Sequence, residues 1–351
     1  MLDTHLNIGD RRVGPGERVY LVAELSANHR QRYEEAEKLV RAAKEAGADA
    51  VKLQTYTPDT ITIESEAEIF RHGAGSLWEG KTLYELYEEA YMPWDWQPKL
   101  KDVAEDLEMD LFSAAFDPTA VDFLEDMGVP AYKVASFEIV DIPLIKRIAR
   151  TGKPVIVSTG MANRAEIEEA VAAVETTGAT QAALLKCTSA YPTPPDEMNL
   201  RAIPRWIADF GIPVGLSDHS LSVETPVAAV ALGASIVEKH FTLSRDVPSP
   251  DVGFSLEPGE FHAMVTAVRQ TERALGQAEY EVGEEEAPSL AFRRSLFVVA
   301  DVKAGEAFTK ANVRSIRPAA GLHPRHLEEV LGRKAQTDIA SGTPLTWELV
   351  A

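Results

Sequence analysis

Two short apolar runs of the sequence each end in a histidine with a carboxylate close to it. The run "VGLSDHS" contains Asp218 and His219, and "VEKHFTL" contains Glu238 and His240. Two imidazoles without a thiolate suit a borderline divalent ion such as Mn2+, with positions left open for water or substrate. A structural zinc site would need four protein ligands. Either histidine alone would be better explained as a core residue bonded to a backbone carbonyl, but the matched pair favours a metal site.

Other apolar runs also end in polar side chains, among them lysines and serines. An unpartnered buried lysine costs stability or loses its charge, so a set of them calls for a partner. Ammonium groups combined with hydroxyls suit a phosphate or carboxylate. We therefore expect a pocket for an anionic ligand, built from the polar groups at these run ends: Lys52, Lys133, Lys186, Ser113, Ser136, Ser158 and Ser217.

Glu24 ends the first apolar run of this kind. A carboxylate that faces both the metal and the anion could shuttle a proton or orient a water molecule. The alternative is a structural ion pair with one of the lysines. The sequence leaves both interpretations open.

These residues need elements that bring them together, and the sequence predicts such elements. Eight strand-like runs alternate with segments of helical period that stop at glycine, which predicts a parallel sheet covered by helices. Eight repeats favour a closed (β/α)8 TIM barrel, whose active site forms at the strand C-termini. An open doubly wound sheet is the alternative, but it would call for a glycine-rich phosphate loop after an early strand, and none is present. The predicted strands span 20–25, 50–55, 111–116, 131–136, 155–160, 183–188, 214–219 and 236–241.

The predicted barrel covers residues 1–276 and is followed by an acidic linker, 277–289, and a small domain, 290–351. Within the barrel, residues 56–110 form a long aromatic-rich insertion that suits a substrate wall, a subunit contact or an extra packed helix. The small domain has short strands broken by Gly and Pro, and it is near the lower size limit for independent folding.

Composition excludes several classes of protein. The 351 residues carry a formal net charge of -20, which argues against a nucleic-acid-binding or membrane-surface protein. A single cysteine, Cys187, excludes an intrachain disulfide and fits a reducing compartment. The chain shows neither the apolar core of a signal peptide nor a run long enough to cross a membrane, so we expect a cytoplasmic protein.

The chain resembles the sialic acid synthase family over nearly its whole length. The resemblance rests on a series of motifs in order, which is more specific than any one of them. They include "AELSANH", "VKLQTYTPDTIT", "AYKVASFEIVDIPLI", "STGMA", "LLKCTSAYPTP", "GLSDHS" and "EKHFTL". The C-terminal part resembles the antifreeze-like (β-clip) domain of these synthases through "VRSIRP" and "GLHP".

The resemblance implies a synthase that condenses phosphoenolpyruvate with an N-acetylated amino sugar and releases phosphate. It implies Glu24 as the catalytic carboxylate, with His219 and His240 as ligands of a divalent metal ion, Mn2+ with Mg2+ or Co2+ as alternatives. It also implies a domain-swapped homodimer in which the small domain of one subunit caps the barrel of the other. The implied phosphoenolpyruvate-binding residues are Lys52, Lys133, Ser136, Ser158 and Ser217, and the implied sugar-binding residues are Gln54, Tyr191, Glu238, Asp251 and Arg317.

Departures from the family pattern bear on the sugar. Ser189 stands where synthases of N-acetylneuraminate tend to carry asparagine, which favours a different sugar from theirs. The leading expectation is 2,4-diacetamido-2,4,6-trideoxy-L-altrose, with N-acetylmannosamine and the legionaminic acid precursor as alternatives. A metal-dependent aldolase or isomerase would explain the histidines but would leave the lysines and serines with less to do. A non-enzymatic alternative treats the small domain as a carbohydrate- or ice-binding module.

Overall fold

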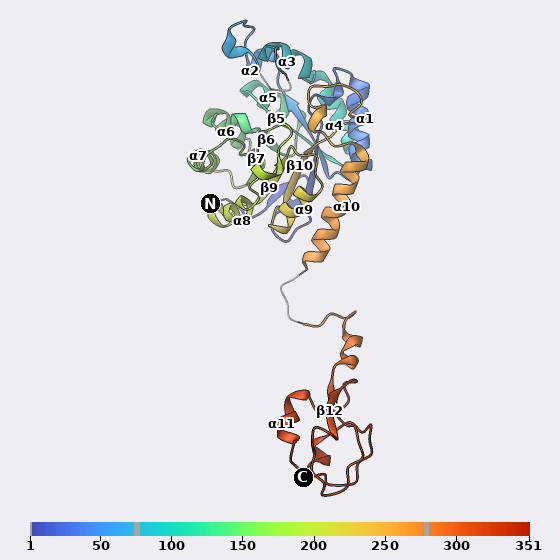
Figure 1. The fold of residues 1–351 in the computed structure, drawn as a ribbon. Coiled ribbons are helices and arrows are strands. Elements are labelled where there is room, and N and C mark those ends of the chain that lie inside the picture. Colours follow the sequence, from blue (N-terminus) through green and yellow to red (C-terminus); the bar gives the residue numbers. More distant parts are fainter. Residues whose placement is uncertain (1, 74–77, 277–280) are drawn as a thin grey trace. The chain divides into compact units, whose positions relative to one another are not determined.

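The computed structural model describes residues 2–73, 78–276 and 281–351. The chain divides into two compact units, Met1–Gly276 and Gln277–Ala351. Figure 1 shows the fold of each unit. Each unit has its own hydrophobic core. The predicted linker lies partly outside the described residues, and its described part, 281–289, is exposed.

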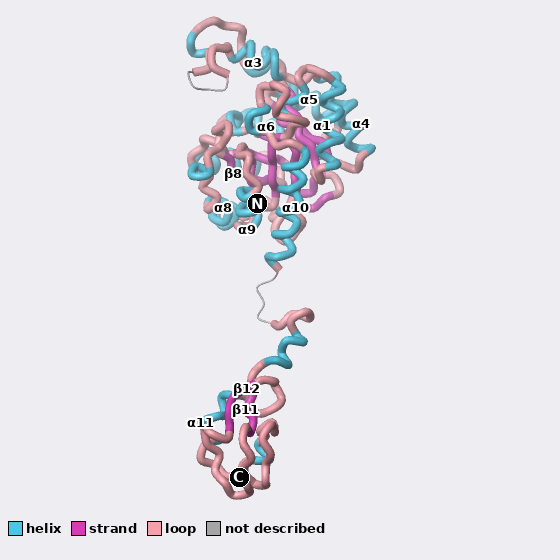
Figure 2. The backbone as a smooth tube through the Cα atoms, turned by 45° about the vertical axis from the view of Figure 1, so that its right-hand side comes forward, coloured by secondary structure: helices cyan, strands magenta, loops and turns pink. Residues whose placement is uncertain are grey.

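The first unit is a closed barrel of parallel strands, so the predicted fold class is confirmed. Each strand pairs in parallel with the next, and β10 pairs with β3 to close the ring. Figure 2 shows the strands surrounded by helices. The barrel strands are β3 (Tyr20–Glu24), β4 (Ala50–Thr55), β5 (Asp110–Ala115), β6 (Tyr132–Val134), β7 (Val155–Ser158), β8 (Ala182–Cys187), β9 (Val214–Asp218) and β10 (Ile236–His240).

The outer helices follow from apolar stripes and local capping. In α1, the residues Ala36, Leu39, Val40 and Ala43 are buried, which is the spacing of one helix face. Asp117 caps α5 by accepting hydrogen bonds from backbone N–H groups of its first turn. The outer helices are α1 (Tyr33–Glu45), α4 (Gln97–Asp106), α5 (Pro118–Met127), α6 (Ile142–Ala149), α7 (Arg164–Glu175), α8 (Ala202–Phe210), α9 (Glu224–Ala231) and α10 (Pro258–Leu275).

The insertion after β4 contains two short helices, α2 (Pro58–Ile61) and α3 (Leu83–Ala90), before α4. Thr82 and Glu85 form a reciprocal capping box that starts α3. Trp94 donates from Nε1 to the carbonyl of Tyr56 at 3.1 Å, which ties the end of the insertion to its beginning. The described part of the insertion is therefore packed structure above the barrel.

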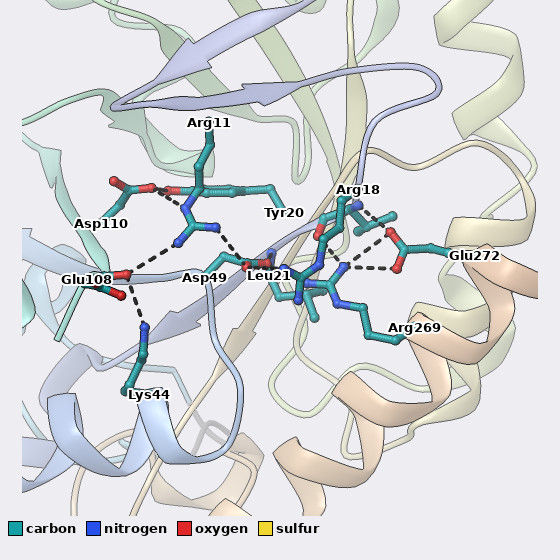
Figure 3. Close-up of polar contacts among 11 residues, drawn as sticks. Arg11, Arg18, Tyr20, Leu21, Lys44, Asp49, Glu108, Asp110, Arg269 and Glu272 are labelled. Atoms are coloured by element: carbon teal, nitrogen blue, oxygen red, sulfur yellow. Dashed lines mark hydrogen bonds and ion pairs between the residues drawn. The ribbon is translucent and has the colours of Figure 1, made fainter.

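An antiparallel hairpin, β1 (Leu6–Ile8) and β2 (Arg11–Val13), precedes the barrel and was not predicted from the sequence. An ion-pair network joins it to the N-terminal ends of the barrel strands (Figure 3). Asp49 is the centre of this network: Arg269 of α10 contacts it at 2.6 Å and Arg11 at 3.4 Å. Contacts at the N-terminal end of a barrel contribute to stability, because the catalytic groups gather at the C-terminal end.

The second unit contains β11 (Ser295–Val298), β12 (Val313–Ile316) and α11 (Leu327–Val330). Its core is made of buried apolar residues that include Leu296, Phe308 and Leu345. Among the described residues, no helix of either unit has both the length and the apolar character that crossing a membrane requires.

Candidate active site

A cavity of about 660 Å3 lies at the C-terminal ends of the barrel strands, within the usual size range of small-molecule sites. Most of the predicted site residues line it, although they come from seven different segments of the chain. The predicted residues in its lining are Lys52, Gln54, Lys133, Ser136, Ser158, Tyr191, Ser217, His219, Glu238, His240 and Asp251.

Strand register explains why these side chains meet. Across neighbouring strands, His240 pairs with Glu24, and Glu24 pairs with Lys52. Glu238 pairs in the same way with Ser217. Because paired residues in parallel strands point to the same face, all of these side chains enter the barrel interior.

Lys52 is the central cation of this group and is 4% exposed. Its Nζ lies 2.9 Å from Glu24 Oε2 and 3.3 Å from Glu238 Oε1. Burial raises the pKa of Glu24 to about 7, although Lys52 opposes that shift. Burial opposes the charge of Lys52, but Glu238 and Glu24 outweigh burial and raise its pKa, so Lys52 stays charged. Glu24 can hold or release a proton near neutral pH.

Glu24 itself is fully buried and does not appear in the cavity lining. Its Oε1 accepts a hydrogen bond of 2.7 Å from Gln54 Nε2, and its Oε2 faces Lys52. Gln54 and Lys52 do line the cavity. Glu24 thus reaches the cavity through these two side chains, and the ion pair that the sequence left as an alternative is present.

Lys133 is the second cation in the cavity. Its Nζ donates to Ser158 Oγ at 2.6 Å and to the Val134 carbonyl at 2.9 Å. Burial lowers the pKa of Lys133 to about 8. Without a carboxylate in direct contact, this ammonium group keeps its capacity to neutralise an anionic ligand.

A cradle of hydroxyls and one backbone N–H group lies beside Lys133. Gly160 N donates to Ser136 Oγ at 3.1 Å, and Ser136 Oγ contacts Cys187 Sγ at 3.4 Å. A Cβ on Gly160 would lie 2.8 Å from Ser136 Oγ and closer still to Ser189 Oγ. The close approach of backbone and hydroxyls therefore requires glycine at this position.

The two predicted metal ligands face each other, with their ring centroids 5.2 Å apart. His219 Nδ1 lies 3.0 Å from the carbonyl of Thr188, which can only accept, so Nδ1 carries the proton and Nε2 keeps its lone pair. Burial lowers the pKa of His240 well below its usual value, which keeps that imidazole neutral. Burial disfavours the charged form of His219, but its contacts with Cys187 and the Thr188 carbonyl outweigh burial and raise its pKa. Neutral imidazoles are the ligating form, so an ion bound by the pair would compete with a proton at His219 but not at His240.

No group of three or more His, Cys, Asp or Glu side chains with metal-binding geometry occurs in the part of the chain that the structure describes. The carboxylate next to His219 does not join the pair. Asp218 points out of the barrel and pairs with the buried Lys239 at 2.6 Å. An ion held by the two histidines would need its remaining ligands from water or substrate.

The structure corrects the prediction for Ser113. Register pairs Lys52 with Phe112 and Leu53 with Ser113, so Ser113 points toward the helix layer. Its Oγ lies 2.6 Å from Thr55 Oγ1, and it does not line the cavity. Its predicted place in the pocket for an anionic ligand, phosphoenolpyruvate, is contradicted because the side chain points to the other face of the strand.

Strand register also places Lys186 outside the cavity. Cys187 pairs with the inward-facing Ser217, and Lys186 therefore faces outward. Its Nζ donates to the Cys187 carbonyl at 2.7 Å and to Thr188 Oγ1 at 3.1 Å. The expectation of three lysines around one anion is thereby reduced to Lys52 and Lys133.

Arg317 belongs to the second unit, where it is exposed. Its predicted contact with the sugar involves the other unit or another subunit and stays a prediction.

Sequence reasoning missed Glu138, which lines the cavity two residues after Ser136. One carboxylate oxygen, Oε2, is buried and has no hydrogen-bond partner in the described part of the chain. Burial raises the pKa of Glu138 to about 7. The signal was its place in a short 3-10 turn, Ser136–Glu138, directly after β6, where strand-end residues enter the site.

Comparison with known proteins agrees with this geometry. Residues 39–280 match the NeuB family model, and residues 293–351 match the SAF domain model. The chain is 45% identical over 328 residues to pseudaminic acid synthase of Campylobacter jejuni strain 81-176, covering 93% of this chain and 95% of the relative. It is 42% identical over 327 residues to pseudaminic acid synthase of Helicobacter pylori, covering 93% and 96%.

The fold also matches a solved structure of N-acetylneuraminic acid synthetase from Leptospira borgpetersenii, with a TM-score of 0.72 and 30% identity. That match covers 82% of this chain and 96% of the other.

Proposed function

This chain belongs to the NeuB family, and we propose on that basis that it is a transferase that makes pseudaminic acid. The proposed reaction joins phosphoenolpyruvate, 2,4-diacetamido-2,4,6-trideoxy-L-altrose and water, and it yields pseudaminic acid and phosphate. The observation that carries the proposal is the cavity that combines Lys52 and Lys133, a set of serine hydroxyls and a histidine pair. An aldolase or isomerase would need the histidines but would give the cations and hydroxyls no anion to bind.

Phosphoenolpyruvate would bind between the two lysines. Lys133 offers a charge-assisted hydrogen bond, and Ser136, Ser158 and Ser217 offer hydroxyls of the kind that hold phosphate or carboxylate oxygens. The anion would raise the low pKa of Lys133 and so fix its charge. These two lysines would attract an anion to the cavity although the chain as a whole carries a formal net charge of -20.

The reaction forms one carbon–carbon bond and one carbon–oxygen bond, the latter from water, and it breaks the carbon–oxygen bond to phosphate. C3 of the enol attacks the aldehyde carbon of the open-chain sugar, and the aldehyde oxygen takes a proton to become a hydroxyl. Water adds to C2, loses a proton, and the tetrahedral intermediate expels phosphate together with its bridging oxygen. Cations placed at the departing phosphate stabilise the charge that develops there.

His219 and His240 would hold a divalent ion, for which we propose Mn2+, with Mg2+ and Co2+ as alternatives. Bound there, the ion would supply polarisation of the aldehyde oxygen. Proton handling falls to carboxyl groups whose pKa lies near neutrality. Glu24 and Glu138 both meet that condition. Glu138 borders the cavity directly, whereas Glu24 reaches it only through Lys52 and Gln54 and would act by positioning them.

The test is release of phosphate from phosphoenolpyruvate in the presence of each candidate sugar, with and without a chelator. We expect release with the trideoxy altrose, loss of release on chelation and recovery on adding Mn2+. In 18O-labelled water the label should enter the acid. Label in the phosphate would contradict cleavage of the C–O bond.

The second candidate is the same condensation with N-acetylmannosamine or the legionaminic acid precursor. It is favoured by the structural match to an N-acetylneuraminic acid synthetase. A higher kcat/KM with either of these sugars than with the altrose would select it.

We also propose that the enzyme is a domain-swapped homodimer in which Arg317 of one subunit completes the cavity of the other. Two apolar rim residues of the cavity, Phe137 and Met161, are 61% and 62% exposed and would gain from being covered. Mixing inactive Arg317→Ala subunits with inactive Lys133→Met subunits should restore part of the activity after exchange. No restoration, together with a monomer in sedimentation, would contradict the proposal.

A further inference from the structure

One part of the cavity lining differs in chemistry from the polar strand ends. The insertion after β4 contributes Ile61, Leu83, Leu86 and Ala90, and the residue after β5 contributes Phe116. We define these five side chains as the apolar wall. Among the described lining residues between 56 and 90, none is an Asp, Glu, Lys or Arg.

Aromatic rings support this wall and fix its position. The ring of Tyr56 packs edge-on against Tyr87 at 5.6 Å and against Phe116 at 5.1 Å. Tyr56 is 3% exposed. Packing of this kind holds the wall in place before any ligand arrives, which lowers the ordering cost of binding.

A series of ring contacts connects the insertion to the histidine pair. The ring centroid of Tyr191 lies 4.4 Å from that of His219 and 6.1 Å from that of Trp78. The centroids of Trp78 and His72 are 5.4 Å apart. Trp78 Nε1 also donates to the Pro250 carbonyl at 3.1 Å, which anchors the insertion to the loop after β10. A sugar with its aldehyde carbon at His219 would therefore extend past Tyr191 toward the insertion.

One polar atom in this region lacks a partner. His72 Nε2 is buried and has no hydrogen-bond partner among the residues that the structure describes, and His72 lines the cavity. Burial lowers the pKa of His72, so the ring is neutral and can bond to an amide. An acetamido group has the complementary polar atoms and also a methyl group that suits apolar surroundings.

We propose that the apolar wall and His72 form the subsite for the far end of a 4-acetamido-6-deoxy sugar, and that the wall selects the C6 methyl group over a C6 hydroxymethyl group. This inference rests on the proposed function and deepens it. A C6 hydroxyl placed against the wall would lose water without gaining a charged partner. A hydrophobic pocket discriminates such differences by about 10- to 200-fold.

The test compares 2,4-diacetamido-2,4,6-trideoxy-L-altrose with its 6-hydroxy counterpart in the full-length enzyme. Phosphate release gives kcat/KM for each sugar, and the ratio of the two is the selectivity. We expect the wild-type selectivity to be at least about tenfold in favour of the 6-deoxy sugar.

Leu83→Gln places an amide in the wall at nearly constant volume, and Leu83→Met is the matched apolar control. We expect Leu83→Gln to lower the selectivity by about tenfold, whereas Leu83→Met should keep it within about twofold. The KM for phosphoenolpyruvate should stay unchanged in both, and thermal unfolding confirms that both are folded.

The outcomes separate this inference from the proposed function. Phosphate release with an unchanged selectivity in Leu83→Gln, or a wild-type selectivity near one, would overturn the role of the wall and leave the proposed function standing. No phosphate release with either sugar would overturn the proposed function and the inference with it.

Discussion

The sharpest prediction compares two lysines that look alike in the sequence. Lys133 and Lys186 both lie near the ends of barrel strands, but only Lys133 lines the cavity. Lys133 is 1% exposed, and a charge-assisted contact between such a group and an anion is worth about 2–5 kcal/mol when one partner is removed. We therefore expect Lys133→Met to lower kcat/KM for phosphoenolpyruvate by about 30- to 4,000-fold.

Lys186→Met removes the same charge from a side chain that bonds only to the Cys187 carbonyl and Thr188 in the structure. We expect a change of less than about fivefold in kcat/KM, with a loss of about 1 kcal/mol in the free energy of unfolding. Initial rates of phosphate release with phosphoenolpyruvate varied provide the measurement. Thermal unfolding should show that Lys133→Met changes the free energy of unfolding by no more than about 1 kcal/mol, because replacing a buried charge with an apolar group is often neutral.

Equal losses of kcat/KM in the two variants would refute the reasoning, since they would mean that strand parity does not decide which lysine meets the anion. A larger loss in Lys186→Met would refute it more strongly.

Three further predictions test separate parts of the molecule. Burial lowers the pKa of Lys133 to about 8, and the protonated form is the one that binds an anion, so kcat/KM for phosphoenolpyruvate should fall above about pH 8; the pH profile of Lys133→Met should lack this fall. Asp49→Ala removes the acceptor that Arg269 contacts at 2.6 Å at the far end of the barrel, so urea unfolding should show a loss of about 2–4 kcal/mol while kcat/KM stays unchanged; a selective loss of activity would contradict this. Gly160→Ala should raise the KM for phosphoenolpyruvate by up to about 100-fold, because the added Cβ would displace both Ser189 Oγ and Ser136 Oγ. An unchanged KM would show that the cradle is not part of that site.

The strands were predictable because each is an apolar run of the right length that ends in polar residues and is followed by a helical period. All eight predicted strands overlap barrel strands of the structure. The hairpin of β1 and β2 escaped prediction because strands of three residues are too short to show a periodic pattern.

The site was predictable only in part, as Ser113 and Asp218 illustrate. Both are polar residues at a strand end, and both point away from the cavity. A position near a strand end is visible in the sequence, but the face is set by register against the neighbouring strand. A shift of one residue reverses that face.

The order of the barrel strands and their helices, the closed barrel and the presence of polar groups near the strand C-termini were therefore determined by the sequence itself. The apolar runs dictate these features, because they must be buried wherever the chain goes. Which polar groups meet was decided only by the tertiary structure. Contacts such as Lys52 with both Glu24 and Glu238, or Tyr56 with Phe116, depend on residues far apart in the chain that only ring closure and strand register bring together.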